Sequence, residues 1–138
     1  MPKIIKILKR AFLILLVIFV IAGVLWLPYK SGAVPEWRIQ IVGTDGHPVE
    51  GIDVNEEWLD PIEDGRTSVD IRQTDTQGFV AFPERPLHNR LAFGNSPYQP
   101  SAHIYMCRQG QYGQAFWDAK DNVMATSVEL KKGACPFG

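Results

Sequence analysis

The hydrophobic positions of this chain follow two different patterns, and the change between them divides the sequence. From Ala11 to Leu27 the chain is continuously apolar and carries no charge, whereas from Trp37 onward apolar and polar residues alternate. A continuous apolar run of this length is typical of a membrane-spanning helix, and alternation with period two is typical of half-buried strands. The pattern therefore predicts a helical segment over residues 1–30, a short linker over 31–36 and a β domain over 37–138.

The first segment has the composition of a signal anchor. The charge-free run, with the apolar residues just before it, predicts a membrane span over residues 7–27 and a helix that ends at Pro28. Four basic residues precede the run within Met1–Arg10, so the positive-inside rule predicts a cytoplasmic N-terminus and a β domain on the periplasmic side of a bacterial inner membrane. The alternative is a cleaved signal peptide, because Ser31-Gly32-Ala33 carries the small residues that a signal peptidase accepts.

The alternating segments predict about seven strands. In one of them Trp37, Ile39 and Ile41 share a face, and along Ala102–Arg108 apolar and polar residues again change sides at every position. The last predicted strand covers Val123–Lys131. This number of strands favours an all-β fold in which two sheets pack as a β-sandwich, preceded by one transmembrane helix.

Two turn motifs in the β domain resemble those of a known family. The first is Thr44-Asp45-Gly46-His47-Pro48-Val49-Glu50-Gly51, and the second is Thr74-Asp75-Thr76-Gln77-Gly78-Phe79-Val80-Ala81-Phe82-Pro83. Proline fixes a turn dihedral in the first motif, and glycine supplies the backbone freedom that a tight turn needs in both. The order of these motifs resembles the carboxypeptidase regulatory-like domain. The resemblance implies a transthyretin-like, seven-stranded Greek-key β-sandwich and says nothing about activity.

The transthyretin-like class includes an enzyme, 5-hydroxyisourate hydrolase, which has a C-terminal Tyr-Arg-Gly-Ser signature. This chain ends in Ala134-Cys135-Pro136-Phe137-Gly138, so that activity is not carried over. No serine lies in a Gly-x-Ser-x-Gly setting, and the sequence reveals no acid–base pair for catalysis. We therefore expect a protein without enzymatic activity and without a cofactor.

The β domain is acidic. From Ser31 onward the chain has nine basic and fifteen acidic residues, a net charge of −6, although the whole chain carries only −1. A surface that binds nucleic acid needs a basic stripe that displaces counterions, and this composition does not supply one. The charge argues against nucleic acid and leaves a protein partner near the outer side of the membrane as the expected ligand.

A polar insertion, Glu56–Arg66, interrupts the alternating pattern and is the predicted binding loop. Clustered carboxylates suit a divalent cation, but their spacing does not match an EF-hand loop, and the three histidines are too scattered for a zinc site. We therefore expect a solvated acidic loop without a metal. The candidate contact residues are Glu56, Glu57, Trp58, Asp60, Glu63 and Asp64.

The remaining candidates are cysteines and aromatic residues. Cys107 and Cys135 are the only cysteines in the sequence, and outside the cytoplasm they predict a disulfide that ties the C-terminal tail to a central strand. Aromatic side chains near predicted loops would form a stacking platform for a sugar if they were exposed together. A glycan-binding module is therefore the alternative function, and a small metal-dependent enzyme is a further one. The platform residues are Tyr98, Tyr112 and Trp117.

Overall fold

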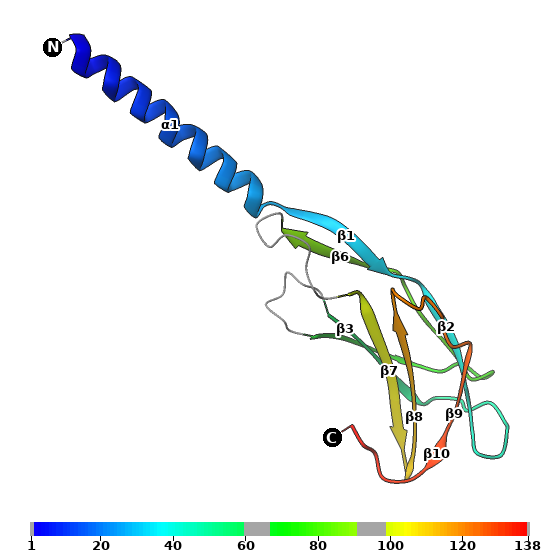
Figure 1. Cartoon of the computed structure of the whole chain (residues 1–138). Helices are drawn as coiled ribbons and strands as arrows, with labels where there is room; N and C mark the ends of the chain where they lie inside the picture. The colour runs from blue at the N-terminus through cyan, green and yellow to red at the C-terminus, as the bar shows by residue number, and fades with distance from the viewer. Residues whose placement is uncertain (1, 60–66, 91–98, 138) are drawn as a thin grey trace.

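The computed structural model describes residues 2–59, 67–90 and 99–137. Within these ranges the chain forms one helix followed by ten strands, so the protein is mostly β with an N-terminal apolar helix, as the pattern predicts. The helix α1 spans Pro2–Trp26 (Figure 1). The strands are β1 Pro28–Val34, β2 Trp37–Val42, β3 Asp53–Leu59, β4 Thr67–Gln73, β5 Phe79–Phe82, β6 Arg85–Arg90, β7 Ser101–Arg108, β8 Gln111–Asp118, β9 Ser127–Glu129 and β10 Lys131–Lys132.

The prediction of seven strands was wrong. The predicted last strand, Val123–Lys131, contains β9 and the start of β10, which belong to different sheets. The chain passes from one sheet to the other at Leu130, whose side chain is buried between them. One alternating run thus supplies a strand to each sheet, and the alternation alone gives no sign of the change.

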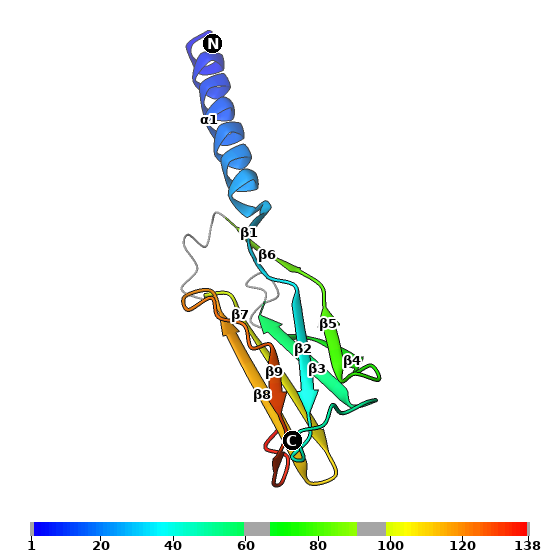
Figure 2. The ribbon, with the colours of Figure 1, turned by 90° about the vertical axis from the view of Figure 1, so that its right-hand side faces the viewer.

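The strands form three sheets. A five-stranded sheet has the order β10-β8-β7-β3-β4, a three-stranded sheet has the order β5-β2-β9, and β1 pairs with β6 as a two-stranded ribbon. Neighbouring strands are antiparallel except for β2 and β9, which are parallel. In Figure 2 the three-stranded sheet lies in front of the five-stranded sheet.

The inward faces of the two larger sheets meet in one hydrophobic core. Trp37, Ile39 and Ile41 of β2 are at most 1 % exposed, which confirms the predicted face. From the five-stranded sheet, Ile104 and Met106 are fully buried. Burial of such side chains is the main term that stabilises a small domain. Because alternate residues of a strand point to opposite sides, the other face of the five-stranded sheet is left on the outside.

Both turn motifs have the backbone conformation that their glycines predict. Gly46 and Gly78 have φ angles of 81° and 75°, in the region that favours glycine. A Cβ on Gly78 would also lie 2.7 Å from the carbonyl oxygen of Ile41. In the same hairpin Asp75 Oδ1 accepts a hydrogen bond from the N–H of Phe79 at 2.8 Å. Glycine at position 78 is therefore needed for both its conformation and its size.

The β1–β6 ribbon joins the helix to the β domain. Only Leu27 separates the end of α1 from β1, which pairs with β6 from Pro28 opposite Arg90 to Val34 opposite Arg85. The prediction of a linker over 31–36 is corrected, because most of this segment lies in a paired strand. A register shift between Lys30 and Gly32 interrupts the regular alternation there.

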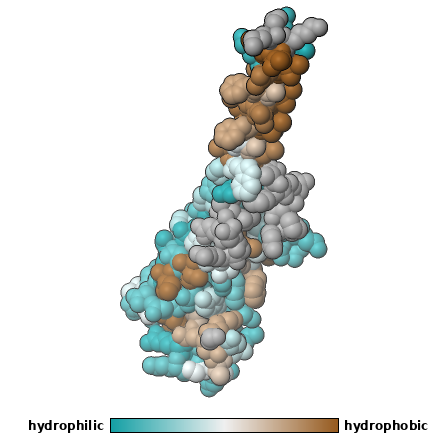
Figure 3. All heavy atoms as spheres, turned by 90° about the vertical axis from the view of Figure 1, so that its left-hand side faces the viewer, coloured by the Kyte–Doolittle hydropathy of each residue, from teal (hydrophilic) through white to brown (hydrophobic). Residues whose placement is uncertain are grey.

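The helix is long and apolar enough to cross a membrane over Ile4–Trp26, and none of this stretch is buried against the domain. A signal sequence has the same length and composition, and neither property defines on which side of a membrane the domain lies. Figure 3 shows the helix as an apolar rod that extends from a largely hydrophilic domain.

Candidate binding face

The exposed side of the five-stranded sheet carries aligned side chains, which we call the outer face. Registry places residues from four strands in straight rows, although the strands come from distant parts of the sequence. Two successive rows cross the sheet from β4 through β3 and β7 to β8: Val69, Glu57, His103 and Phe116, then Ile71, Asn55, Tyr105 and Gln114.

Three apolar side chains of the outer face are exposed to solvent. Val69 is 48 %, Ile71 61 % and Phe116 63 % exposed. Val69 and Ile71 belong to β4, which ends the sheet with no other described strand beyond it. An edge strand presents backbone groups that can pair with another chain, and gathered apolar side chains mark interaction surfaces. The outer face therefore offers two apolar sites, Val69 and Ile71 on the edge strand and Phe116 on β8, with β3 and β7 between them.

A small hollow of about 180 Å³ lies at one end of the outer face, and its lining is mostly apolar. Strands β3, β4, β7 and β8 all contribute to it. A hollow of this size accepts one side chain and is smaller than the usual pocket for a drug-sized ligand. The residues that line it from the outer side of the sheet are Glu57, Leu59, Thr67, Ser101, His103 and Phe116.

His103 lies beside the hollow and stacks on Phe116, with ring centroids 4.0 Å apart and planes 5° from parallel. Burial lowers the pKa of His103, while a hydrogen bond with Gln114 and the charge of Glu57 act in the opposite direction. The buried Nε2 atom has no hydrogen-bond partner among the residues that the structure describes. The imidazole is therefore neutral at pH 7 and keeps one polar atom without a described partner in an apolar setting.

The C-terminal tail packs against the same face. Cys107 of β7 and Cys135 of the tail form a disulfide with their Cα atoms 5.7 Å apart, consistent with the predicted pairing. Beyond it, the ring of Phe137 lies 5.4 Å from that of His103 and 5.0 Å from that of Tyr105. The disulfide thus holds an aromatic residue of the tail at the border of the outer face.

Part of the predicted binding loop is a strand. Glu56, Glu57 and Trp58 belong to β3, where Glu56 and Trp58 face inward and Glu57 faces outward. The prediction that the loop begins at Glu56 was wrong. The alternate residues from Ile52 to Trp58 all face inward, and one of them is the carboxylate Glu56. The other predicted contact residues, Asp60, Glu63 and Asp64, lie outside the described residues.

An ion-pair cluster explains how a carboxylate occupies an inward position. Glu56 is fully buried and pairs with Arg85 at 3.1 Å. Arg85 also pairs with Asp70 and lies over the ring of Trp58, 4.6 Å from its centroid. Burial raises the pKa of Glu56, and this effect is larger than the lowering caused by the hydrogen bond and positive charge of Arg85. Burial also acts to raise the pKa of Asp70, but Arg72 and Arg85 lower it overall. The cluster joins β3, β4 and β6 and serves the fold.

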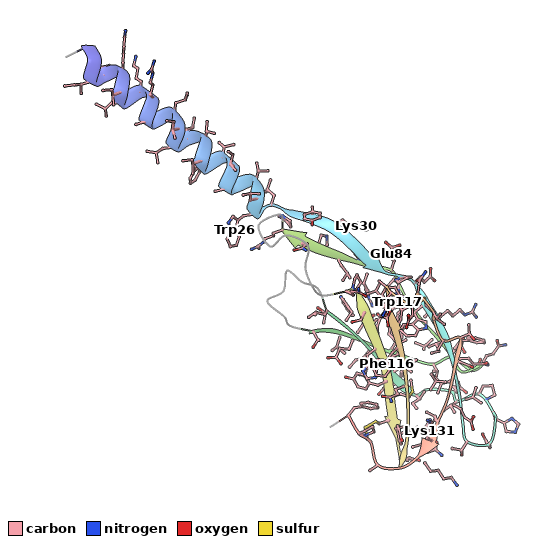
Figure 4. The ribbon with its side chains drawn as sticks, viewed as in Figure 1. Trp26, Lys30, Glu84, Phe116, Trp117 and Lys131 are labelled. Atoms are coloured by element: carbon pink, nitrogen blue, oxygen red, sulfur yellow. A yellow bond between two sulfur atoms is a disulfide. The ribbon has the colours of Figure 1, made fainter. Side chains whose placement is uncertain are left out.

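The predicted aromatic platform does not assemble from the residues proposed for it. Trp117 is 4 % exposed, and its indole N–H donates to Asn122 Oδ1 at 3.3 Å. Tyr112 lies on the side of β8 opposite to Trp117, because residues 112 and 117 are an odd number of positions apart on the strand. Tyr98 lies outside the described residues. Phe116, which is not one of the three predicted platform residues, is an exposed aromatic residue of β8 (Figure 4).

The candidate site rests on its own geometry. Within the described ranges, no group of three or more His, Cys, Asp or Glu side chains is placed to hold a metal ion. The chain matches no protein-family model, and no curated protein matches it. What the arrangement offers is three exposed apolar side chains on one face, a hollow for one side chain and an edge strand.

Proposed function

We propose that this protein is a membrane-tethered, extracytoplasmic binding module without catalytic activity, and that it presents the outer face to a protein partner. The observation that carries the proposal is the exposure of Phe116 beside the hollow and of Val69 and Ile71 on the edge strand of the same face. Apolar surface in contact with water costs about 25 cal/mol per Å². A partner that covers these side chains recovers that free energy, which is why such patches mark binding sites.

The proposal includes a β-sandwich of the transthyretin-like class, related to the carboxypeptidase regulatory-like domain. Two features support it: the five- and three-stranded sheets share one buried core, and the turn glycines Gly46 and Gly78 have positive φ angles. In a sandwich the inward faces form the core, so the outer faces and loops are free for binding.

The N-terminal helix is proposed to be retained as an anchor. Cleavage after Ala33 would remove nearly all of β1 and leave β6 without its paired strand, although Leu87 and Asn89 of β6 are only 1 % and 4 % exposed. Such a loss would expose backbone groups and apolar surface. The basic residues in the first turns of the helix favour a cytoplasmic N-terminus and a periplasmic domain. An anchored domain meets membrane-bound partners at a raised effective concentration.

A protein partner is favoured over a glycan by the kind of side chain that is exposed. Sugar-binding platforms use the flat rings of Trp and Tyr. The exposed apolar residues of the outer face are Val69, Ile71 and Phe116, whereas Trp117 is buried. Aliphatic side chains on an edge strand suit contact with another polypeptide.

The test is site-specific photo-cross-linking of the full-length protein in intact membranes. A photoreactive residue at position 116 should give a discrete adduct with one protein, and the same residue at position 81, an exposed site on β5, should not. Ile71→Thr should reduce the adduct from position 116 several-fold, because threonine removes apolar surface and keeps β propensity. Mass spectrometry of the same material would identify the N-terminal residue.

Three results would overturn the proposal. Equal adducts from positions 81 and 116, or an adduct that Ile71→Thr does not change, would exclude the outer face as the binding site. An N-terminus at Val34 would show that the domain is released, and would remove the tether.

A further inference from the structure

The end of the helix and the end of β6 meet at one point, where Arg90 lies. Arg90 is the last residue of β6 and pairs with Pro28, two positions after the last helical residue. Its guanidinium lies over the ring of Trp26, 5.4 Å from the centroid. Figure 4 shows Trp26 at the end of the helix, beside the end of β6. Strand pairing therefore holds a cation against the aromatic residue that ends the apolar helix.

Arg90 has no acidic partner within the described part of the chain. By contrast, Arg85 at the other end of β6 pairs with Glu56. The buried Nε atom of Arg90 has no hydrogen-bond partner among the described residues. Because Nε is buried, an external anion would accept hydrogen bonds from the terminal nitrogens of the guanidinium, and its charge would compensate for the partial loss of hydration of the group.

The end of the ribbon nearest the helix is basic. Its first three registered pairs contain Lys30, His88 and Arg90 and no acidic residue. Lys30 forms an ion pair with Glu84 at 3.0 Å, and both side chains are more than half exposed. Arg90 is therefore the cation at this end that is best placed to receive an external anion.

The depth of Arg90 in a membrane follows from its contact with Trp26, and this step rests on the proposed tether. A tryptophan at the end of a spanning helix lies at the bilayer interface, at the level of the lipid headgroups. A guanidinium stacked on that ring lies at the same depth. Arginine binds phosphate through two parallel N–H···O bonds, and stacking on an aromatic face leaves the edge of the guanidinium available for them.

We propose that Arg90 and Trp26 form a binding site for the phosphate group of a phospholipid in the leaflet that faces the β domain. The backbone of β6 positions the guanidinium, and the ring of Trp26 holds it flat. Because β1 and β6 continue from this point into the domain, a bound headgroup fixes the depth and tilt of the ribbon. The site thereby orients the outer face relative to the membrane.

The experiment titrates full-length protein in detergent micelles with dioleoylphosphatidylglycerol and counts bound lipids by native mass spectrometry. Arg90→Gln should weaken lipid retention about tenfold or more, because it removes a charge-assisted bidentate contact. Arg90→Lys should give an intermediate loss, since lysine keeps the charge without the planar fork. The matched control is Arg38→Gln, because Arg38 also lies over an aromatic ring, 4.5 Å from the centroid of Phe79, and belongs to β2 in the domain.

Dioleoylglycerol, which has the same chains without phosphate, should not be retained. Excess inorganic phosphate should not displace the phospholipid, because the acyl chains contribute to its binding. Thermal unfolding of each variant checks that the fold is intact. The inference is overturned if Arg90→Gln retains as much lipid as wild type, or if Arg38→Gln loses as much as Arg90→Gln. Failure of the tether is distinguishable, because it appears as an N-terminus at Val34.

Discussion

Two carboxylates that share Arg85 have pKa values shifted in opposite directions by their surroundings. Glu56 is fully buried and its Oε1 has no hydrogen-bond partner among the described residues, so the loss of hydration outweighs the ion pair. For Asp70 burial also acts to raise the pKa, but contacts with Arg72 and Arg85 lower it overall. Asp70 is therefore the partner that stabilises the cluster at neutral pH, and Glu56 carries a cost when it ionises.

We expect Glu56→Gln to gain stability relative to wild type as the pH rises. A carboxyl whose pKa is raised on folding stabilises the native state fully below its unfolded pKa, near 4.5, and this contribution is lost as the pH rises through the folded value. Glutamine resembles the protonated carboxyl at every pH. Urea unfolding between pH 4.5 and 8 should show the free energy of unfolding changing in favour of the variant.

Asp70→Asn is the matched control, and its trend should have the opposite sign. A carboxyl whose pKa is lowered on folding contributes stability above its unfolded pKa, near 3.8, and that contribution is lost as the pH falls through the folded value. The asparagine variant should be less stable than wild type at pH 7, and the difference should shrink on acidification. The same pH trend in both variants would contradict these assignments.

Gly113→Ala is expected to destabilise the domain by about 1–3 kcal/mol, the usual cost of overpacking a core. Gly113 lies on the inner side of β8, where a Cβ would be 2.7 Å from both Met106 Sδ and Val128 Cγ1. Gly32→Ala is the control, because its Cβ would lie 3.6 Å from Pro100, an ordinary contact. Thermal unfolding should separate the two variants, and an equal loss at both positions would refute this explanation.

At the level of strands and loops, the sequence predicts those elements whose alternation is uninterrupted. The inward face of β2 and both glycine turns follow from local pattern alone. Strands β1 and β3 do not follow from local pattern. The pattern of β1 is broken by a register shift, and the true extent of β3 is hidden by Glu56. In each case the stabilising partner, β6 or Arg85, lies far along the chain.

The candidate site is harder to predict than the strands that form it. Neighbouring residues of a strand point to opposite sides, so Phe116 faces outward because Trp117 faces inward. The sequence predicts this once Trp117 is known to be buried. The row that also contains Val69, Glu57 and His103 depends on β3 lying between β4 and β7. That order is set by pairing between distant segments, which the alternation of a single strand does not encode.

Replacing both Cys107 and Cys135 with serine is expected to lower the free energy of unfolding by about 3–4 kcal/mol in the chain-entropy model. The two residues are separated by 28 positions, so the disulfide restricts a sizeable loop in the unfolded chain. It also holds Phe137 against the outer face. Urea unfolding measures the loss. Phe137→Ala with the disulfide intact should cost less, and an equal cost would assign the effect to the aromatic contact instead.

At the scale of the whole molecule, one residue separates the helix from β1 and two separate β1 from β2. Figure 1 shows the ribbon continuing from the end of α1 into the β domain. Paired strands bend less freely than a single chain, so the β1–β6 pairing should limit how far the domain tilts relative to the helix. With the helix anchored as proposed, the pairing would hold the outer face within a restricted range of heights above the membrane.

This restriction predicts the effect of inserting six glycine and serine residues between Leu27 and Pro28. Such a segment behaves as a flexible coil, so the distance between the domain and the membrane should become broadly distributed. The measurement is energy transfer from a fluorophore at position 131, on β10, to headgroup-labelled lipids in nanodiscs. The same six residues added after Gly138 are the control and should leave the distribution narrow. If the unmodified protein already gives a distribution as broad as the insertion variant, the ribbon does not hold the domain, and orientation of the outer face must come from its partner.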